Sequence, residues 1–467
     1  MNTVEVLGTL VKALEAGSYN VAPGLLNQGA ALQIENLETA MQNVTYQNED
    51  LILQKEVKTI PCKATTYQFD RQLSYGNWGG SAQNEGVVGQ YDDSDFVRDI
   101  VPMAYYSTLR RVTIPANLVQ TIDGKKAEDR AASDAAMKLA GDIEFDLFRG
   151  KADFSNAGVF DGNDLVIARI PNMKGIDPQV RRSDFDTNTQ DLMFAEYGSN
   201  LSVVIAGGGV LTQVMIENAY TRSRINFGSP SHLLVDNLVL SAYSQAQASA
   251  QRIVLGGSAQ NAVGQDIRKQ WVCGGTVALE ASRFLSGKFT VASSARQKTG
   301  VPGAPTAGAV TQTAGTTAFV SGAKYYYSVS ASNEIGEGLD TLLAQVTIST
   351  TGNYVTIPTL AATNSPKYFN VYRTGANGAA ATRRFIGRVA VLSSSTSFID
   401  LGNKVPGFVT GFMLQPDSMV MPEMQPYSRI QVATQDLTKS EIHFRFVSLA
   451  VWQPRKSVLI DNLIGNF

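Results

Sequence analysis

Residues that could carry out catalysis or bind a metal are few in this chain. It has 467 residues but only two histidines, His232 and His443, and two cysteines, Cys62 and Cys273. Neither cysteine lies in a metal-ligand spacing, and no recognised motif surrounds His232. We expect His443, which lies in an alternating segment beside aromatic residues, to be a core or interface histidine, and Cys273 to be a buried, inert thiol. The GxSxG and HExxH motifs are missing, so the sequence predicts no catalytic residue, no metal site and no cofactor.

Two other clusters could bind a ligand. Gly207–Gly209 follows an expected strand and precedes an expected helix, where backbone N–H groups can bind an anion. A phosphate loop would need a Gly-Lys-Ser/Thr or GxGxxG pattern, so a structural turn is favoured over a ligand loop. The acids Asp92, Asp93, Asp95 and Asp99 could hold a hard cation. Their spacing lacks the glycine and the final glutamate of an EF-hand, so a solvated surface is favoured.

Arginines offer a third chemistry, the recognition of another protein. Doublets occur at Arg110-Arg111, Arg181-Arg182 and Arg383-Arg384, and Arg222 and Arg224 flank a serine. These arginines could be solvated surface, or they could form salt bridges across subunit contacts, where arginine is favoured over lysine. The candidate inter-subunit contacts are Arg71, Trp78, Arg110, Arg111, Arg181 and Arg182.

The composition excludes several classes of protein. With 44% hydrophobic and 17% charged residues, the chain is not intrinsically disordered. A net charge of −2 argues against a protein whose main task is binding nucleic acid. The longest apolar run, Val203–Leu211, is too short to span a bilayer, and the N-terminus does not read as a secretory signal. Two cysteines fit a reducing compartment, so we expect a protein made inside a cell.

The first 150 residues predict extended segments followed by a long helix. Residues 1–55 are interrupted by Gly, Pro and Asn, and we expect an arm with one short helix. The β-rich runs Cys62–Phe69 and Tyr105–Ile114 flank a glycine-rich polar stretch, which predicts a long β-hairpin. A hairpin of this kind is marginal by itself and is usually functional or docked on a partner. From Asp123 to Gly150, apolar residues recur every three or four positions, which predicts a helix lying across a sheet.

The rest of the chain predicts an α/β body that contains an all-β insertion. Strands and helices alternate over residues 160–290, and a Gly/Ala/Thr/Pro linker then spans 293–318. Closely spaced strands follow, a pattern typical of an immunoglobulin-like sandwich. They are expected at Lys324–Ser332, Leu342–Ser349, Tyr354–Pro358, Lys367–Thr374, Arg384–Val391 and Ser397–Leu401. The later strands Arg429–Val432, Glu441–Trp452 and Ser457–Ile460 need partners in the body, so the sandwich is most simply an insertion.

The order of these segments resembles the major capsid proteins of tailed bacteriophages, which have the Hong Kong 97-type fold. Phe148–Asp153 is similar to the turn that follows the spine helix in that family, and Leu449–Ile464 resembles its closing strands in large contractile-tailed phages. Tyr326–Gly338 is similar to a fibronectin type III strand and turn. The resemblance implies an α+β fold. Its parts are an N-terminal arm (1–55), an extended hairpin loop with flanking strands (56–115), a spine helix (116–160), an axial and peripheral α/β body (161–295), an inserted immunoglobulin-like domain (296–412) and closing strands (413–467).

The resemblance also implies a function. The chain is expected to form hexamers and pentamers of an icosahedral head that encloses double-stranded DNA without specific binding. Its expected partners are further copies of itself, a scaffold protein, a portal and decoration proteins. No membrane partner is expected. The protein is expected in the capsid of the virion, which would be assembled in the host cytoplasm. No lysine lies between Lys63 and Lys125, so the lysine cross-link of the type member is not expected. Two alternatives stay open: a tail or baseplate protein with an immunoglobulin-like module, and a carbohydrate-active enzyme, which would need paired carboxylates in a cleft.

Overall fold

The computed structural model has mixed helices and sheets, which confirms the predicted α+β class. The described residues are 45–76, 82–89, 91, 93–118, 126–150, 173–180, 202–247, 268–285, 299–333, 335–391, 396–402, 404–433 and 437–464. Residues 1–44 of the predicted N-terminal arm lie outside them. The chain divides into two units: the first comprises 1–45, 111–133 and 433–440, and the second comprises 46–110, 134–432 and 441–467. No helix among the described residues is both long and apolar enough to cross a membrane.

Six α-helices and twenty-two β-strands are described. The helices are α2 (Ile52–Glu56), α3 (Ile114–Leu118), α4 (Ala127–Arg149), α5 (Ile176–Val180), α7 (Gln213–Ile225) and α8 (Asn237–Gln247). The strands outside the predicted sandwich are β1 (Lys58–Pro61), β2 (Thr66–Ser74), β3 (Asp95–Pro102), β4 (Ala104–Thr113), β5 (Val203–Ile205), β6 (His232–Val235), β7 (Lys269–Val272), β8 (Gly275–Ala281), β18 (Val409–Leu414), β19 (Met419–Val432), β20 (Thr438–Val447), β21 (Ala450–Val451) and β22 (Val458–Leu463).

In the first unit, one carboxylate joins three segments. Glu128 near the start of α4 accepts hydrogen bonds from the Asn117 side chain at 3.0 Å and from Lys439 Nζ at 3.0 Å. The backbone N–H of Ile114 donates to the carbonyl of Leu437 at 2.9 Å. These contacts tie the short helix α3 to the start of α4 and the start of β20.

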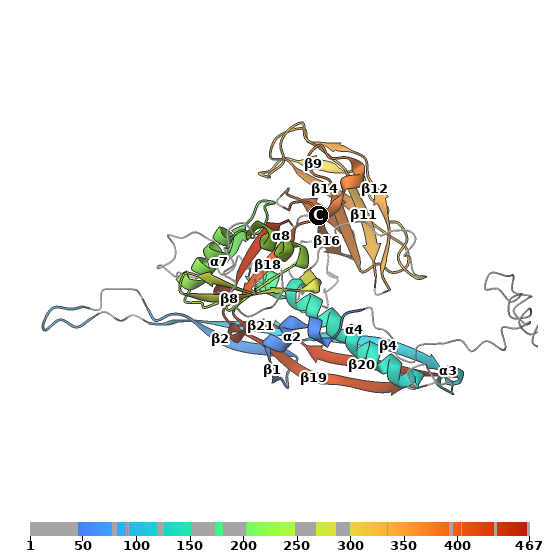
Figure 1. The fold of residues 1–467 in the computed structure, drawn as a ribbon, viewed down its shortest axis with the longest axis horizontal. Coiled ribbons are helices and arrows are strands. Elements are labelled where there is room, and N and C mark those ends of the chain that lie inside the picture. The colour runs from blue at the N-terminus through green and yellow to red at the C-terminus, as the bar shows by residue number, and fades with distance from the viewer. Residues whose placement is uncertain are drawn as a thin grey trace, which may run out of the picture. The chain divides into compact units, whose positions relative to one another are not determined.

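The second unit contains a six-stranded sheet with the order β5-β22-β18-β6-β8-β7. Helices α7 and α8 pack on this sheet (Figure 1). Thr212 caps α7, because its hydroxyl accepts a hydrogen bond from the N–H of Met215. Alternate buried strand residues, such as Leu233 and Val235 of β6, belong to the same core cluster as Ile216 and Tyr220 of α7. β8 and β18 are neighbours of β6 in this sheet, so the chain between them is an insertion in sequence order.

A second sheet has the order β1-β19-β20-β4, with β21 paired to β19. The predicted hairpin differs from the one observed. β2 pairs with β3, from Thr66 opposite Pro102 to Ser74 opposite Asp95, whereas the run Tyr105–Ile114 lies in β4 and pairs with β20. The sequence prediction joined two β-rich runs across the glycine-rich stretch. It overlooked the nearer strand because Asp95, Arg98 and Asp99 make that strand look like a polar loop.

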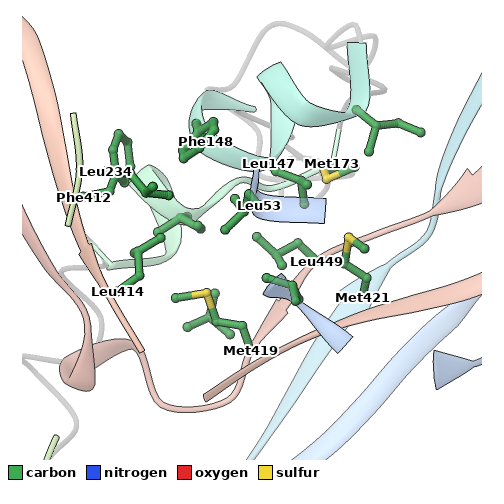
Figure 2. Close-up of a cluster of buried hydrophobic side chains, with 14 of the residues drawn as sticks. Leu53, Leu147, Phe148, Met173, Leu234, Phe412, Leu414, Met419, Met421 and Leu449 are labelled. Carbon is green, nitrogen blue, oxygen red and sulfur yellow. The ribbon is translucent and has the colours of Figure 1, made fainter. Parts of the chain in front are cut away.

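The C-terminal half of α4 lies in a core, not only across a sheet. Ile143, Leu147 and Phe148 are fully buried, and the rings of Phe148 and Phe412 lie 5.3 Å apart. Figure 2 shows Leu147 and Phe148 meeting Leu53 of α2, residues of β6, β18 and β19, and Met173 and Leu449. Gly150 ends the helix, as predicted. A Cβ there would lie 2.3 Å from the carbonyl oxygen of Met173, so a side chain is excluded by backbone.

The segment between β8 and β18 forms a β-sandwich. Its strands are β9 (Thr311–Thr313), β10 (Lys324–Tyr325), β11 (Tyr327–Ser332), β12 (Glu337–Leu342), β13 (Val346–Thr347), β14 (Tyr354–Leu360), β15 (Tyr368–Arg373), β16 (Arg384–Ala390) and β17 (Thr396–Asp400). Two sheets, β12-β11-β15-β16 and β17-β14-β9, share one core. β9 lies inside the predicted linker, and Glu337 starts a strand where a turn was expected.

The core of this sandwich holds a buried ion pair. Arg373 and Asp400 are each about 5% exposed and bind one another, and Tyr327 Oη donates to Asp400 at 2.9 Å. The Arg373 guanidinium also lies over the rings of Phe319 and Tyr325, at 5.0 and 5.5 Å. Removing either charge would leave the other buried and unpaired, so the pair fixes how the two sheets meet.

Candidate interaction surface

The β2–β3 hairpin exposes several large apolar side chains. Tyr75, Phe96 and Ile100 are 90, 64 and 53% exposed. Its base is anchored, because Tyr67, Phe69 and Val101 pack with residues of the second sheet around Val420 and Ala450. A two-stranded ribbon is marginal alone, so the exposed part of this hairpin gains little stability from its own chain.

Ion pairs hold the two strands of the hairpin in register. Arg98 lies directly opposite Asp70 and binds it through Nε at 2.7 Å, and this hydrogen bond lowers the pKa of the Asp70 carboxyl. Arg71 binds Asp99 on the other face of the hairpin and lies over the Phe69 ring at 5.5 Å. Opposite charges on paired strands therefore set the register that the apolar pattern alone would leave loose.

One face of the second sheet is also apolar and is partly open, beyond the part near Val420 that the base of the hairpin covers. Contacts of Tyr427 with His443 and of Glu423 with Arg445 put odd-numbered residues of β19 and β20 on the same face, which packs toward α2. The even-numbered residues therefore share the other face, together with alternate residues of β4. Its exposed members are Tyr105, Leu109, Met424, Ile430 and Ile442, which are 36–62% exposed. Exposed apolar area of this extent on neighbouring strands is typical of a protein–protein contact.

The structure places three of the six predicted contact residues. Arg71 is 9% exposed and is paired with Asp99 of its own chain. Arg110 is half-buried in β4, and Arg111 is exposed and donates to Thr438 at 3.1 Å. Trp78, Arg181 and Arg182 lie outside the described residues. Of the other arginines, Arg383 binds Asp340 at 3.1 Å. Several of these guanidinium groups therefore have intrachain roles, and a role between subunits stays a prediction.

The glycine cluster forms a turn, and Asp99 of the aspartate cluster is paired with an arginine of the hairpin. Gly207 and Gly208 have positive φ, and the N–H of Gly208 donates to Asn462. Helix α7 begins at Gln213, so these glycines do not form its N-terminus. Asp99 binds Arg71, and Asp92 lies outside the described residues. In the part of the chain that the structure describes, no group of His, Cys, Asp and Glu could hold a metal.

The structure confirms the prediction for His443 and contradicts the prediction for Cys273. His443 is fully buried, as predicted, and its ring is stacked beside Tyr427, whose hydroxyl lies 2.9 Å from Nδ1. Burial lowers the pKa of this imidazole. The prediction for Cys273 was wrong, because its thiol is exposed. Cys273 lies in the tight turn between β7 and β8, where Gly274 has a φ of 96° and the turn directs the side chain into solvent.

Two buried carboxylates on α4 were missed by the sequence analysis. Glu144 accepts hydrogen bonds from the N–H groups of Leu53 at 2.8 Å and Gln54 at 3.1 Å, so it caps α2. Asp146 accepts one from Tyr106 Oη at 2.8 Å. Burial raises the pKa of both, that of Asp146 to about 7. The sequence does contain one signal of their burial, because both residues lie on the apolar side of the helix. Their partners are structural, and they do not form the cleft-lining pair that a glycosidase needs.

Comparison with known proteins gives relatives of one kind. The chain is 28% identical over 148 residues to the major capsid protein of Staphylococcus phage K, which is 32% of this chain and 31% of that protein. It is 21% identical over 473 aligned positions, 97% of this chain and 94% of the other, to a protein of Enterococcus phage phiEF24C that is provisionally named a major capsid protein. No protein-family model matches. The predicted resemblance to phage major capsid proteins is thus confirmed.

Two solved structures of low similarity match nearly the whole chain. A capsid chain of a native GTA particle is 9% identical with a TM-score of 0.48, and the match covers 96% of this chain and 100% of that one. A chain of Gordonia phage Cozz is also 9% identical, with a TM-score of 0.44, 96% of this chain and 97% of the other being covered. Scores below 0.5 indicate only a loose correspondence.

Proposed function

We propose that this chain is the major capsid protein of a phage, with a Hong Kong 97-type fold, and that many copies assemble into hexamers and pentamers of a closed shell. The observation that carries the proposal is sequence similarity to a phage capsid protein along 97% of the chain. The near-zero net charge suits a wall that encloses DNA without binding it tightly. The same proposal gives the chain no catalytic role and no cofactor.

The exposed hairpin and the open sheet face support a role in assembly. Each is an apolar surface on a backbone that is already hydrogen-bonded, so covering it requires little rearrangement. One such contact is weak, but a subunit held by several neighbours at once is retained by the sum of its contacts. Arg71, Trp78, Arg110, Arg111, Arg181 and Arg182 belong to this proposal as contact residues. The proposal also includes a separate scaffold protein, a portal and decoration proteins as partners. It places assembly in the host cytoplasm.

Removal of the hairpin tests the proposal. A full chain in which residues 72–98 are replaced by a short Gly-Ser turn should keep the thermal melting of the folded subunit, because the anchored base of the hairpin is retained. It should not form closed particles in electron micrographs under conditions in which the unaltered chain does. Normal shells from the deletion would contradict the role of the hairpin. Tubes or discrete rings from the unaltered chain would instead favour a tail or baseplate protein.

We also propose that the β-sandwich is an immunoglobulin-like domain inserted into the capsid fold. It has its own core of fourteen buried residues and its own buried ion pair, Arg373–Asp400. A fragment of residues 300–412 expressed alone should therefore unfold cooperatively. The fragment with Asp400→Ala should be strongly destabilised, because Arg373 would be left buried without its carboxylate. An unfolded unaltered fragment would count against an autonomous insertion.

A further inference from the structure

Arg110 in β4 is a half-buried arginine for which the described part of the chain supplies no carboxylate partner. Its Nε atom is buried, and no described residue accepts a hydrogen bond from it. Other arginines of the second sheet do have acidic neighbours: Arg445 binds Glu423 through Nε at 2.7 Å, and Arg429 lies 3.8 Å from Glu441. A guanidinium that is partly withdrawn from water and lacks a partner is unfavourable to the subunit.

The buried imidazole of His443 in β20 lies within the electrostatic reach of Arg110. Its Nδ1 atom is 2.9 Å from the hydroxyl of Tyr427. Its Nε2 atom is buried and has no hydrogen-bond partner among the described residues, since Oε2 of Glu441 is 3.7 Å away. Burial is the main cause that lowers the pKa of this imidazole; Glu441 acts against it, and the charges of Arg429 and Arg110 add to the lowering. The imidazole is therefore neutral at neutral pH.

The charges of this cluster do not balance. Arg110 and Arg429 each carry a permanent positive charge, Glu441 carries a negative charge, and the imidazole is neutral. One further anionic group would balance the cluster, and a guanidinium binds a carboxylate or another oxyanion through two parallel N–H bonds. The position of Arg110 also favours a ligand from outside the chain. β4 is the last strand in the order β1-β19-β20-β4, and the side chain of Arg110 is still partly exposed there.

We propose that Arg110, with His443 beside it, forms a site for one oxyanion, and that on assembly this oxyanion is a carboxylate of a second copy of the chain. The second copy rests on the proposed function, because the similarity to capsid proteins is what makes other copies the partner at hand. The oxyanion rests on the unpartnered Nε atom and on the excess of positive charge. An unfavourable feature of the lone subunit becomes a favourable contact in the shell. A free inorganic anion has the same chemistry and is the other occupant to be tested.

Substitution of Arg110 should impair assembly without impairing the subunit. Arg110→Gln should not lower the melting temperature of the unassembled chain, because no hydrogen bond or ion pair to a described residue is lost. The concentration needed for particle formation, measured by light scattering and checked by electron microscopy, should rise at least about tenfold. Arg110→Lys keeps the charge but loses the paired N–H groups, so it should also raise this concentration. Lys324→Gln, at an exposed position in the sandwich, removes the same charge and should change neither quantity.

Inorganic sulfate tests the oxyanion site without assembly. The chain has only two histidines, so NMR can follow the ring of His443 in the unassembled chain, and His232→Gln identifies its signal. An anion beside an imidazole favours the protonated form. Sulfate in place of chloride at equal ionic strength should therefore raise the pKa of His443, and Arg110→Gln should abolish the rise. If sulfate has no such effect, the oxyanion site is overturned.

The two measurements separate the site from the assembly. If the unaltered chain forms shells and Arg110→Gln forms them at the same concentration, the contact with a second copy is overturned while the proposed function stands. A sulfate effect in that case would mean that the site takes a free anion only. If the unaltered chain forms no shells under any condition, it is the proposed function that fails, and the sulfate measurement alone then decides the oxyanion site.

Discussion

Asp146 should make the stability of the subunit depend on pH in a direction opposite to that of most carboxylates. Its carboxyl is 8% exposed and accepts a hydrogen bond from Tyr106, whose oxygen in turn accepts one from the N–H of Met173. Burial is the main cause that raises its pKa from 3.8 to about 7, and Asp142 adds to this, while the bond from Tyr106 acts against it. The folded state therefore binds a proton more tightly than the unfolded chain does.

The sign and size of the effect follow from this difference. Because the pKa in the folded state is raised, the contribution of Asp146 to stability is complete below pH 3.8 and is lost as the pH rises to about 7. The shift corresponds to at most about 4 kcal/mol in the free energy of unfolding. Asp146→Asn keeps an oxygen that can accept the Tyr106 hydroxyl and cannot ionise. It should therefore be more stable than the unaltered subunit above pH 7, by about 2–4 kcal/mol.

Urea unfolding of the unassembled chain, repeated from pH 4.5 to 8, measures this difference directly. The difference in unfolding free energy between Asp146→Asn and the unaltered chain should grow steadily with pH and level off near pH 7. Asp129→Asn, at an exposed position near the start of α4, is the control and should show no such trend. A difference that is independent of pH would refute the reasoning, because it would mean that Asp146 has the same pKa in both states.

Two further predictions concern the same helix. Leu147 is fully buried in the main core, so Leu147→Ala should lower the unfolding free energy by about 2–5 kcal/mol in urea titrations. Leu118 is 82% exposed, so Leu118→Ala is the control and should change the unfolding free energy by less than about 0.5 kcal/mol. Gly150→Ala should lower the unfolding free energy by about 1–3 kcal/mol, because its Cβ would lie 2.3 Å from a backbone oxygen. Gly375→Ala is the control and should leave the unfolding free energy unchanged, because a Cβ there meets nothing within 4 Å. Equal melting temperatures for the two glycine variants would contradict this account.

The elements predicted best from the sequence are those whose pattern is local. Helix α4 was predicted from Asp123 to Gly150 and is observed from Ala127 to Arg149, because a repeat of three and four residues has no other good explanation. β5, β6 and β8 and the helices α7 and α8 lie within residues 160–290, where alternating strands and helices were predicted. Most sandwich strands were also found, since turn signals separate them at short intervals.

The features that the sequence did not predict depend on contacts between distant segments. Nothing near Glu144 indicates that its carboxylate caps a helix more than ninety positions earlier in the chain. β3 is a strand because Asp70 and Arg71 lie opposite Arg98 and near Asp99, a relation visible only once the hairpin is formed. The exposure of Cys273 likewise depends on the backbone conformation of the turn that follows it.

The candidate surface shows a related reason why a pattern of residues falls short of a function. Alternation in β4 and β20 correctly indicates that each strand has an apolar face, but the same alternation arises whether the chain itself or another copy covers that face. The neighbouring elements decide which: the face that bears His443 packs toward α2, while Ile442 and Leu109 on the other face are exposed.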